Sequence, residues 1–250
     1  MLGSELFFRT PRVSQLALAD VRVPGCFLIC LMVFGLPAIA GPPYRTGDAD
    51  SAEEGTLGVR VGILRVQREA SSTDYLAPLL RLKLALTPGA ELASLLDYSP
   101  ENTQLRDGGL AFKLVSREDG YNIGTETVLM LPVSPHQSGV GFESHVLATI
   151  ERPPFRVHLD VGGFYDPRLA AIARGWRAGM VGERKHGQLR TGLELYVRKA
   201  ADEHLQVQAG LGFVAPAGPV KLRAGMHVGL TSAAPDLAAS IWVTGDTRLW

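Results

Sequence analysis

The chain has little of three things that mark many fold classes: cysteine, net charge and long helical periodicity. Its 250 residues include 2 cysteines, Cys26 and Cys30, and both lie before residue 41. If the chain is exported and residues 1–40 are removed, the remaining protein has no cysteine and therefore no disulfide bonds. Its fold must then be stabilised by other interactions, chiefly those of a β-sheet. The 25 basic and 25 acidic residues balance, so no net field points to nucleic acid or to an acidic substrate. Long apolar runs with a period of 3.6 residues are not apparent, which disfavours a helical fold.

Motifs that identify common enzymes are also missing. The sequence has no G-x-S-x-G and no H-E-x-x-H. Ser144 projects to the face opposite His145 in a strand, so the two cannot act as nucleophile and base. His145 and His158 could in principle share a metal ion with Glu143 or Asp160, but we expect no metal, no cofactor and no catalytic residue. A hydrolase on a barrel wall is kept as the least favoured alternative.

Residues 1–40 have the pattern of a signal peptide. Three arginines precede an apolar run, Cys26–Leu36, and the small residues Ala38 and Ala40 stand where a signal peptidase cleaves. The run is too short for a comfortable transmembrane helix, although a single N-terminal anchor helix is the alternative.

The rest of the chain divides into two parts. Residues 41–54 are polar and rich in proline and glycine, and we expect them to form a periplasmic lead-in. Residues 55–250 carry a different pattern, in which apolar and polar residues alternate. Around Pro153-Pro154 this alternation is clearest, because Phe155, Val157 and Leu159 share one face of a strand and Arg156, His158 and Asp160 the other.

Twelve segments of this kind predict twelve strands, and a phase shift after Ile63 predicts a bulge in the first. The predicted strands are Thr56–Gln67, Tyr75–Leu86, Glu91–Tyr98, Gly109–Arg117, Tyr121–Val133, Phe142–Glu151, Phe155–Tyr165, Ala173–Glu183, Gln188–Arg198, Glu203–Phe213, Val220–Leu230 and Leu237–Thr244.

The connections favour a membrane barrel. Taken alternately, one set is short and the other is mostly longer, as in outer-membrane barrels with short periplasmic turns and longer outer loops. The apolar faces carry no charged residue in most strands. The sequence therefore predicts an all-β fold, an up-and-down antiparallel transmembrane β-barrel of about 12 strands in the bacterial outer membrane. A secreted soluble β-domain is the alternative. At the C-terminus, Asp246 and Arg248 interrupt the expected apolar pattern and leave the extent of the last strand open.

Several stretches resemble an outer-membrane protein family called "MetA-pathway of phenol degradation". They are Gly41-Pro-Pro-Tyr-Arg-Thr-Gly-Asp, Arg106-Asp-Gly-Gly-Leu-Ala-Phe-Lys, Glu126-Thr-Val-Leu-Met-Leu-Pro-Val, Asp160-Val-Gly-Gly-Phe-Tyr and Gly192-Leu-Glu-Leu-Tyr. The resemblance runs through most of residues 41–250. It implies an outer-membrane barrel that moves small, often aromatic, compounds.

If the polar faces point inward, they supply a charged lumen. The predicted lumen-lining residues are Arg81, Lys83, Lys113, Glu126, Glu143, His145, Arg156, His158, Asp160, Arg177, Arg190, Glu194, Arg223 and His227. These charges either pair into ladders that fill the lumen or line a narrow path. In the second case Arg156, Arg177, Arg190 and Arg223 would set selectivity.

The sequence thus predicts a channel or uptake porin for small solutes, aromatic compounds included. The alternative is a plugged barrel with a structural or adhesive role. Expected partners are outer-membrane lipid, the barrel-assembly machinery and an unidentified small solute, but not nucleic acid.

Overall fold

The computed structural model describes residues 44–69, 72–168 and 172–250. The predicted signal peptide, residues 1–40, lies outside these ranges. The described residues form twelve strands and contain no helix that could cross a membrane. The strands are β1 (Thr56–Glu69), β2 (Ser72–Thr87), β3 (Ala90–Ser99), β4 (Gln104–Glu118), β5 (Tyr121–Leu131), β6 (Gly141–Arg152), β7 (Phe155–Asp166), β8 (Ala173–His186), β9 (Leu189–Ala200), β10 (Gln206–Ala217), β11 (Val220–Gly229) and β12 (Leu237–Arg248).

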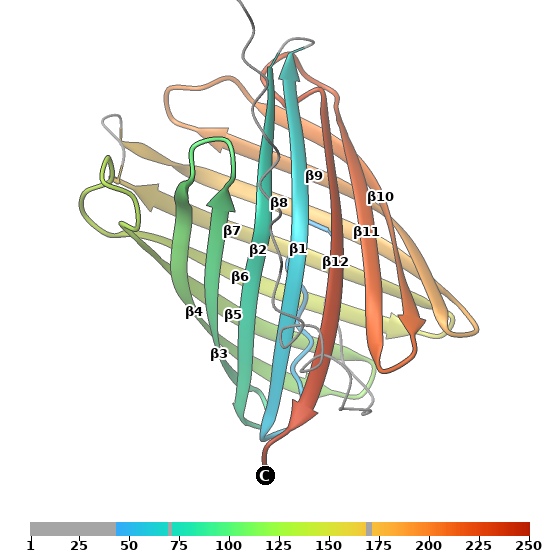
Figure 1. Cartoon of the computed structure of the whole chain (residues 1–250). Coiled ribbons are helices and arrows are strands. Elements are labelled where there is room, and N and C mark those ends of the chain that lie inside the picture. The colour runs from blue at the N-terminus through green and yellow to red at the C-terminus, as the bar shows by residue number, and fades with distance from the viewer. Residues whose placement is uncertain (1–43, 70–71, 169–171) are drawn as a thin grey trace, which may run out of the picture. The chain divides into compact units, whose positions relative to one another are not determined.

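The strands form one closed antiparallel barrel (Figure 1). Each strand pairs with its neighbours in sequence, and β1 closes the barrel against β12. Closure leaves no sheet edge with unpaired backbone groups, which a β-structure within a bilayer requires. The predicted fold class is confirmed. The register shift between Gly62 and Leu64 in the β1–β2 ladder confirms the predicted bulge.

Connection length differs between the two ends of the barrel. At one end all five connections are two residues long, namely 88–89, 119–120, 153–154, 187–188 and 218–219. Gly120 and Gly218 have φ angles of 81° and 64°, a conformation that the commonest two-residue hairpin turns use and that glycine adopts without strain. At the other end the connections run from two residues (70–71) to nine (132–140). The predicted long connection at Arg68–Asp74 is wrong, because β1 and β2 continue through most of it.

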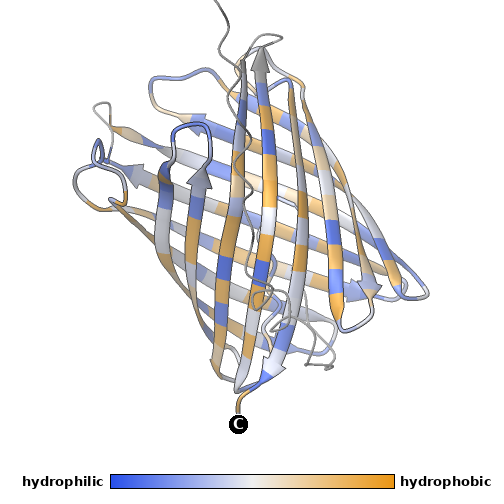
Figure 2. Ribbon diagram, in the orientation of Figure 1, coloured by the Kyte–Doolittle hydropathy of each residue, from blue (hydrophilic) through white to orange (hydrophobic). Residues whose placement is uncertain are grey.

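The barrel exterior is apolar and the interior is polar. Along each strand, hydrophobic and hydrophilic residues alternate (Figure 2). The outward side chains include Leu193 and Val161, which are 71% and 60% exposed, whereas His158, Asp160 and Arg223 are each 1% exposed. An exterior of this kind is stable against lipid but not against water.

We expect Leu193→Arg to destabilise the barrel strongly. An arginine on the lipid face near the middle of a strand costs about 2–4 kcal/mol. Leu193→Ala is the matched control, because it removes apolar contact without adding charge, at ~1–2 kcal/mol. Equilibrium unfolding by urea in lipid vesicles measures both. Equal costs for the two variants would show that this position does not face lipid.

The last strand extends further than the sequence pattern predicts. β12 pairs with β1 as far as Arg248, opposite Thr56. Asp246 is 9% exposed and shares the inward face with Thr244 and Trp242. Asp246 and Arg248, which left the extent of this strand open in the sequence, therefore belong to its interior face.

Candidate functional site

A stretch of backbone from the N-terminal part of the chain occupies the barrel lumen. We call Tyr44–Ala52 the inner segment. Thr46, Ala49 and Ser51 are 2%, 0% and 2% exposed, although none of them belongs to a strand. The sequence predicted a periplasmic lead-in over residues 41–54. Within that range, the structure encloses residues 44–52 in the barrel, which sequence reasoning did not anticipate.

The first half of the inner segment is bound by acidic side chains of the barrel wall. Glu194 of β9 accepts hydrogen bonds from the backbone N of Thr46, at 2.7 Å, and from its hydroxyl, at 2.5 Å. Asp160 of β7 accepts one from the backbone N of Gly47, at 2.8 Å. Buried carboxylates that accept backbone N–H groups form strong, charge-assisted hydrogen bonds. These bonds satisfy backbone groups that would otherwise be stranded away from water.

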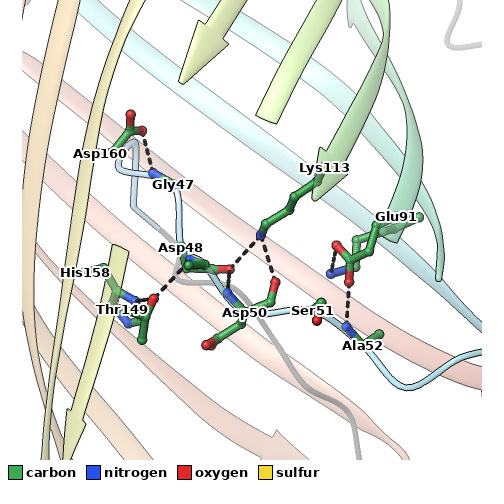
Figure 3. Close-up of polar contacts among 12 residues, drawn as sticks. Gly47, Asp48, Asp50, Ser51, Ala52, Glu91, Lys113, Thr149, His158 and Asp160 are labelled. Atoms are coloured by element: carbon green, nitrogen blue, oxygen red, sulfur yellow. Dashed lines mark hydrogen bonds and ion pairs between the residues drawn. The ribbon is translucent and has the colours of Figure 1, made fainter. Parts of the chain in front are cut away.

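The second half is bound mainly through basic side chains (Figure 3). The Lys113 ammonium lies 3.0 Å from Asp48 Oδ1 and 2.8 Å from the carbonyl oxygen of Asp50. Arg156 donates from Nη2 to both carboxylate oxygens of Asp50, at 2.6 and 2.8 Å. Arg117 donates to the carbonyl oxygen of Ser51 at 2.6 Å.

Two further contacts fix the backbone. The N–H of Ala49 donates to the Thr149 hydroxyl at 3.0 Å, and the N–H of Ala52 donates to Glu91 at 2.5 Å. Wall ligands of the inner segment therefore come from β3, β4, β6, β7 and β9, and β10 adds the carbonyl oxygen of Gly212, which accepts from the Tyr44 hydroxyl. This distribution holds the segment across the lumen rather than along one wall.

Two glycines of the barrel wall make room for the segment. A Cβ atom on Gly179 of β8 would lie 2.1 Å from the Thr46 hydroxyl oxygen. On Gly192 of β9 it would lie 2.4 Å from the Tyr44 hydroxyl, which donates to the carbonyl oxygen of Gly212 at 3.1 Å. Any side chain at Gly179 or Gly192 would therefore compete for space with the inner segment.

Several other lumen charges form a dense network. His145 bridges Asp160 and Glu143 with both ring nitrogens at 2.8 Å. Arg177 joins them through Nε, 2.7 Å from Glu143. Further along, His158 contacts Thr149 at 2.9 Å and Glu183 at 3.3 Å. Such networks are stable only when most members are satisfied, as they are here.

The structure places all fourteen predicted lumen residues on the interior face. Lys113, Arg156, Asp160 and Glu194 hold the inner segment, as given above. The other ten are in the charge network, in ion pairs or in cavity walls, namely Arg81, Lys83, Glu126, Glu143, His145, His158, Arg177, Arg190, Arg223 and His227. Whether any of them contacts a passing solute stays a prediction.

The inner segment lines two cavities of the barrel. One, of about 390 Å³, is lined by Tyr44–Asp48 and by wall residues that include Arg60, Arg81 and Trp242. The other, of about 1010 Å³, is lined by Asp50 and Ser51 and reaches the two-residue turns at Gly187 and Gly218. The lumen is therefore partly filled, with polar space on both sides of the segment.

The two buried aspartates of the inner segment differ in their electrostatics. Burial raises the pKa of Asp48, but the Lys113 ammonium outweighs it, so this pKa is held below its ordinary value. Burial and the Asp48 carboxylate raise the pKa of Asp50 above its ordinary value, against the Arg156 guanidinium. Asp48 is therefore the firmly ionised anchor of the pair.

The lumen histidines are engaged by neighbouring side chains, and the described residues hold no metal-binding cluster. Across residues 44–69, 72–168 and 172–250, no group of three or more His, Cys, Asp or Glu side chains could hold a metal ion. The nitrogens of His145 and His158 are engaged by neighbouring carboxylates and by Thr149.

Sequence reasoning missed the residues of the inner segment and several that hold it or face it. Thr46, Asp48 and Asp50 stood in a polar stretch without periodicity, and Glu91 belongs to the weakest predicted strand. The aspartate pair, Asp48 and Asp50, was the available signal, because the predicted lumen residues include more arginine and lysine than aspartate and glutamate.

Comparison with known proteins shows the fold but no family. No protein-family model matches the chain, and no curated protein matches it. Among solved structures, it is similar to an outer membrane channel from Pseudomonas putida F1, with a TM-score of 0.61, 13% identity, and coverage of 82% of this chain and 100% of that one.

Two porins are similar to a comparable degree. For the KdgM porin the TM-score is 0.58 at 10% identity, with 76% of this chain and 98% of that chain covered. For the NanC porin it is 0.56 at 8% identity, with the same two coverages of 76% and 98%. These neighbours are outer-membrane channel barrels, and at such low identity the likeness concerns the barrel architecture.

Proposed function

We propose that this protein is an outer-membrane channel for small solutes, whose lumen is narrowed by the inner segment. The observation that carries the proposal is the pair of polar cavities within a closed, lipid-compatible barrel. A barrel built only as a scaffold has no need of cavities of about 390 and 1010 Å³ that are lined by many charged side chains. The likeness to channel barrels supports the same conclusion.

The solutes that fit this lumen are small and polar at one end. The resemblance of the sequence to the phenol-degradation family favours aromatic compounds among them. The many interior arginines favour solutes with an anionic group, because a charged wall selects permeating ions by sign.

A plugged barrel with a structural or adhesive role is the second candidate. The inner segment itself favours it, since Thr46, Ala49 and Ser51 are almost completely buried in the lumen. In that case the outer connections, such as residues 132–140, would carry the function. The two candidates differ in whether ions cross the barrel.

Conductance of the purified, refolded protein in planar lipid bilayers tests the proposal. We expect small, well-resolved current steps, because the inner segment narrows the lumen but leaves cavities through which ions can pass. Heat-modifiable migration on a gel serves as the control for folding. If folded protein and a variant without the inner segment both give no steps above background, the channel proposal fails and the plugged barrel stands.

A further inference from the structure

Arg223 of β11 is a buried cation without a partner. It is 1% exposed, and none of its three guanidinium nitrogens has a hydrogen-bond partner within the part of the chain that the structure describes. Other arginines of the same cavity are paired, as Arg81 is with Asp97 and Arg177 with Glu143. An uncompensated charge in such a place is strongly unfavourable, so the structure lacks a counter-charge there.

Two more cations share this part of the wall. Lys221 lies two residues from Arg223 and is opposite Thr244 of β12, which is in turn opposite Arg60 of β1. Directly opposed residues of neighbouring strands project to the same face. Within the described ranges, neither Arg60 nor Lys221 has a hydrogen bond or an ion pair. The Thr244 hydroxyl between them is buried and also lacks a partner.

The acidic residues nearby do not balance these three charges. Asp246 is the acid on the same face of β12, and its Oδ2 is buried without a hydrogen-bond partner. Asp48 also faces Arg223 across the cavity, but its Oδ1 is taken by Lys113 and by the backbone N of Asp50. Three cations thus stand against one unpaired carboxylate.

We propose that Arg223, Arg60, Lys221 and Thr244 form a binding site for a small oxyanion, a carboxylate or a phosphate. The guanidinium of Arg223 presents parallel N–H donors that match two oxygens of such a group. Arg60 and Lys221 supply charge from either side, and the Thr244 hydroxyl donates a further hydrogen bond. Arg60 and Arg223 line the cavity of about 390 Å³, which has room for the body of a small organic anion, and Lys221 lines the cavity of about 1010 Å³. The site does not depend on conduction, because a barrel that conducts nothing would still carry it.

Binding of inorganic phosphate and of benzoate to the detergent-solubilised full chain tests the site. Isothermal titration at low chloride and fixed ionic strength gives both affinities, and the two anions separate a phosphate site from a carboxylate site. We expect Arg223→Gln to weaken binding of whichever anion binds by at least about tenfold. Arg81→Gln is the matched control, since it removes an equal charge that is already paired in the same cavity, and we expect a loss below about threefold.

Two results would overturn the proposal. One is the absence of binding of both anions to the wild-type chain. The other is an equal loss in the two variants, which would assign binding to the general charge of the lumen. If Arg223→Gln does not fold by heat-modifiable migration, Arg223→Lys replaces it. That variant keeps the charge but loses the parallel donors, and it should weaken binding more than Arg81→Lys does.

Discussion

Deletion of residues 44–52 is expected to raise the single-channel conductance by at least about threefold, because it joins the two lumen cavities into one path. The segment is held in the lumen by ligands from six strands, so no other single change should open as much space. The measurement is the step size in planar bilayers at fixed salt. An unchanged step size would mean that ions take a route that avoids the inner segment.

A pair of glycine variants controls for artefacts of the deletion. Gly179→Leu should act in the same direction, since its Cβ would lie 2.1 Å from the Thr46 hydroxyl oxygen and the segment must shift. Gly182→Leu is the control, because Gly182 lies on the same strand and a Cβ atom there would have no neighbouring atom within 4 Å. We expect the second variant to leave conductance unchanged.

Lys113→Met is expected to be among the most destabilising substitutions in the barrel. It leaves the Asp48 carboxylate buried without its partner, which costs about 3–5 kcal/mol. Adding Asp48→Asn to the Lys113→Met variant should recover a large part of the lost free energy of unfolding, because it removes the unpaired buried charge. Urea unfolding of the two single variants and the double variant gives the coupling free energy. Lys185→Met, at an exposed position beside a turn, is the control and should cost little.

The same pair predicts a pH dependence. The folded-state pKa of Asp48 lies below its ordinary value, so its contribution to wild-type stability is complete at neutral pH. It is lost only as the pH falls through that lowered value. In Lys113→Met the stranded carboxylate gains from protonation, so the stability difference between the two proteins should narrow as the pH falls. A coupling near zero, or a difference that widens in acid, would contradict the role given to this ion pair.

The barrel could be predicted from the sequence because the patterns that specify it, alternation within strands and short connections between them, lie in short stretches of the chain. Alternation along each strand fixes which side chains share a face, and short connections predict which strands are neighbours, so the sequence alone places Phe155 and Leu159 on the outward face. The inward side chains followed from the same period, down to His145, Asp160 and Glu194. Errors arose where a strand carried charge on its inward face near an end, as at Asp246.

The inner segment could not be predicted in this way. Its position depends on contacts between residues that are far apart, such as Thr46 with Glu194, 148 positions away. The inner segment has irregular backbone whose hydrogen bonds are made by side chains of the barrel wall. Such a segment has no hydrophobic periodicity that would identify it in the sequence. The sequence did predict charged residues on the lumen wall that bind the inner segment. It did not indicate which residues pair with those charges.

The enclosure of the inner segment has an evolutionary consequence. Asp48 and Lys113, Asp50 and Arg156, and Thr46 and Glu194 each form a unit in which neither residue can change alone without stranding the other. In descendants of such a gene, loss of the segment would release selection on these wall positions together. A relative that has lost the segment should therefore show substitutions at several of them at once, while its lipid-facing positions continue to vary independently.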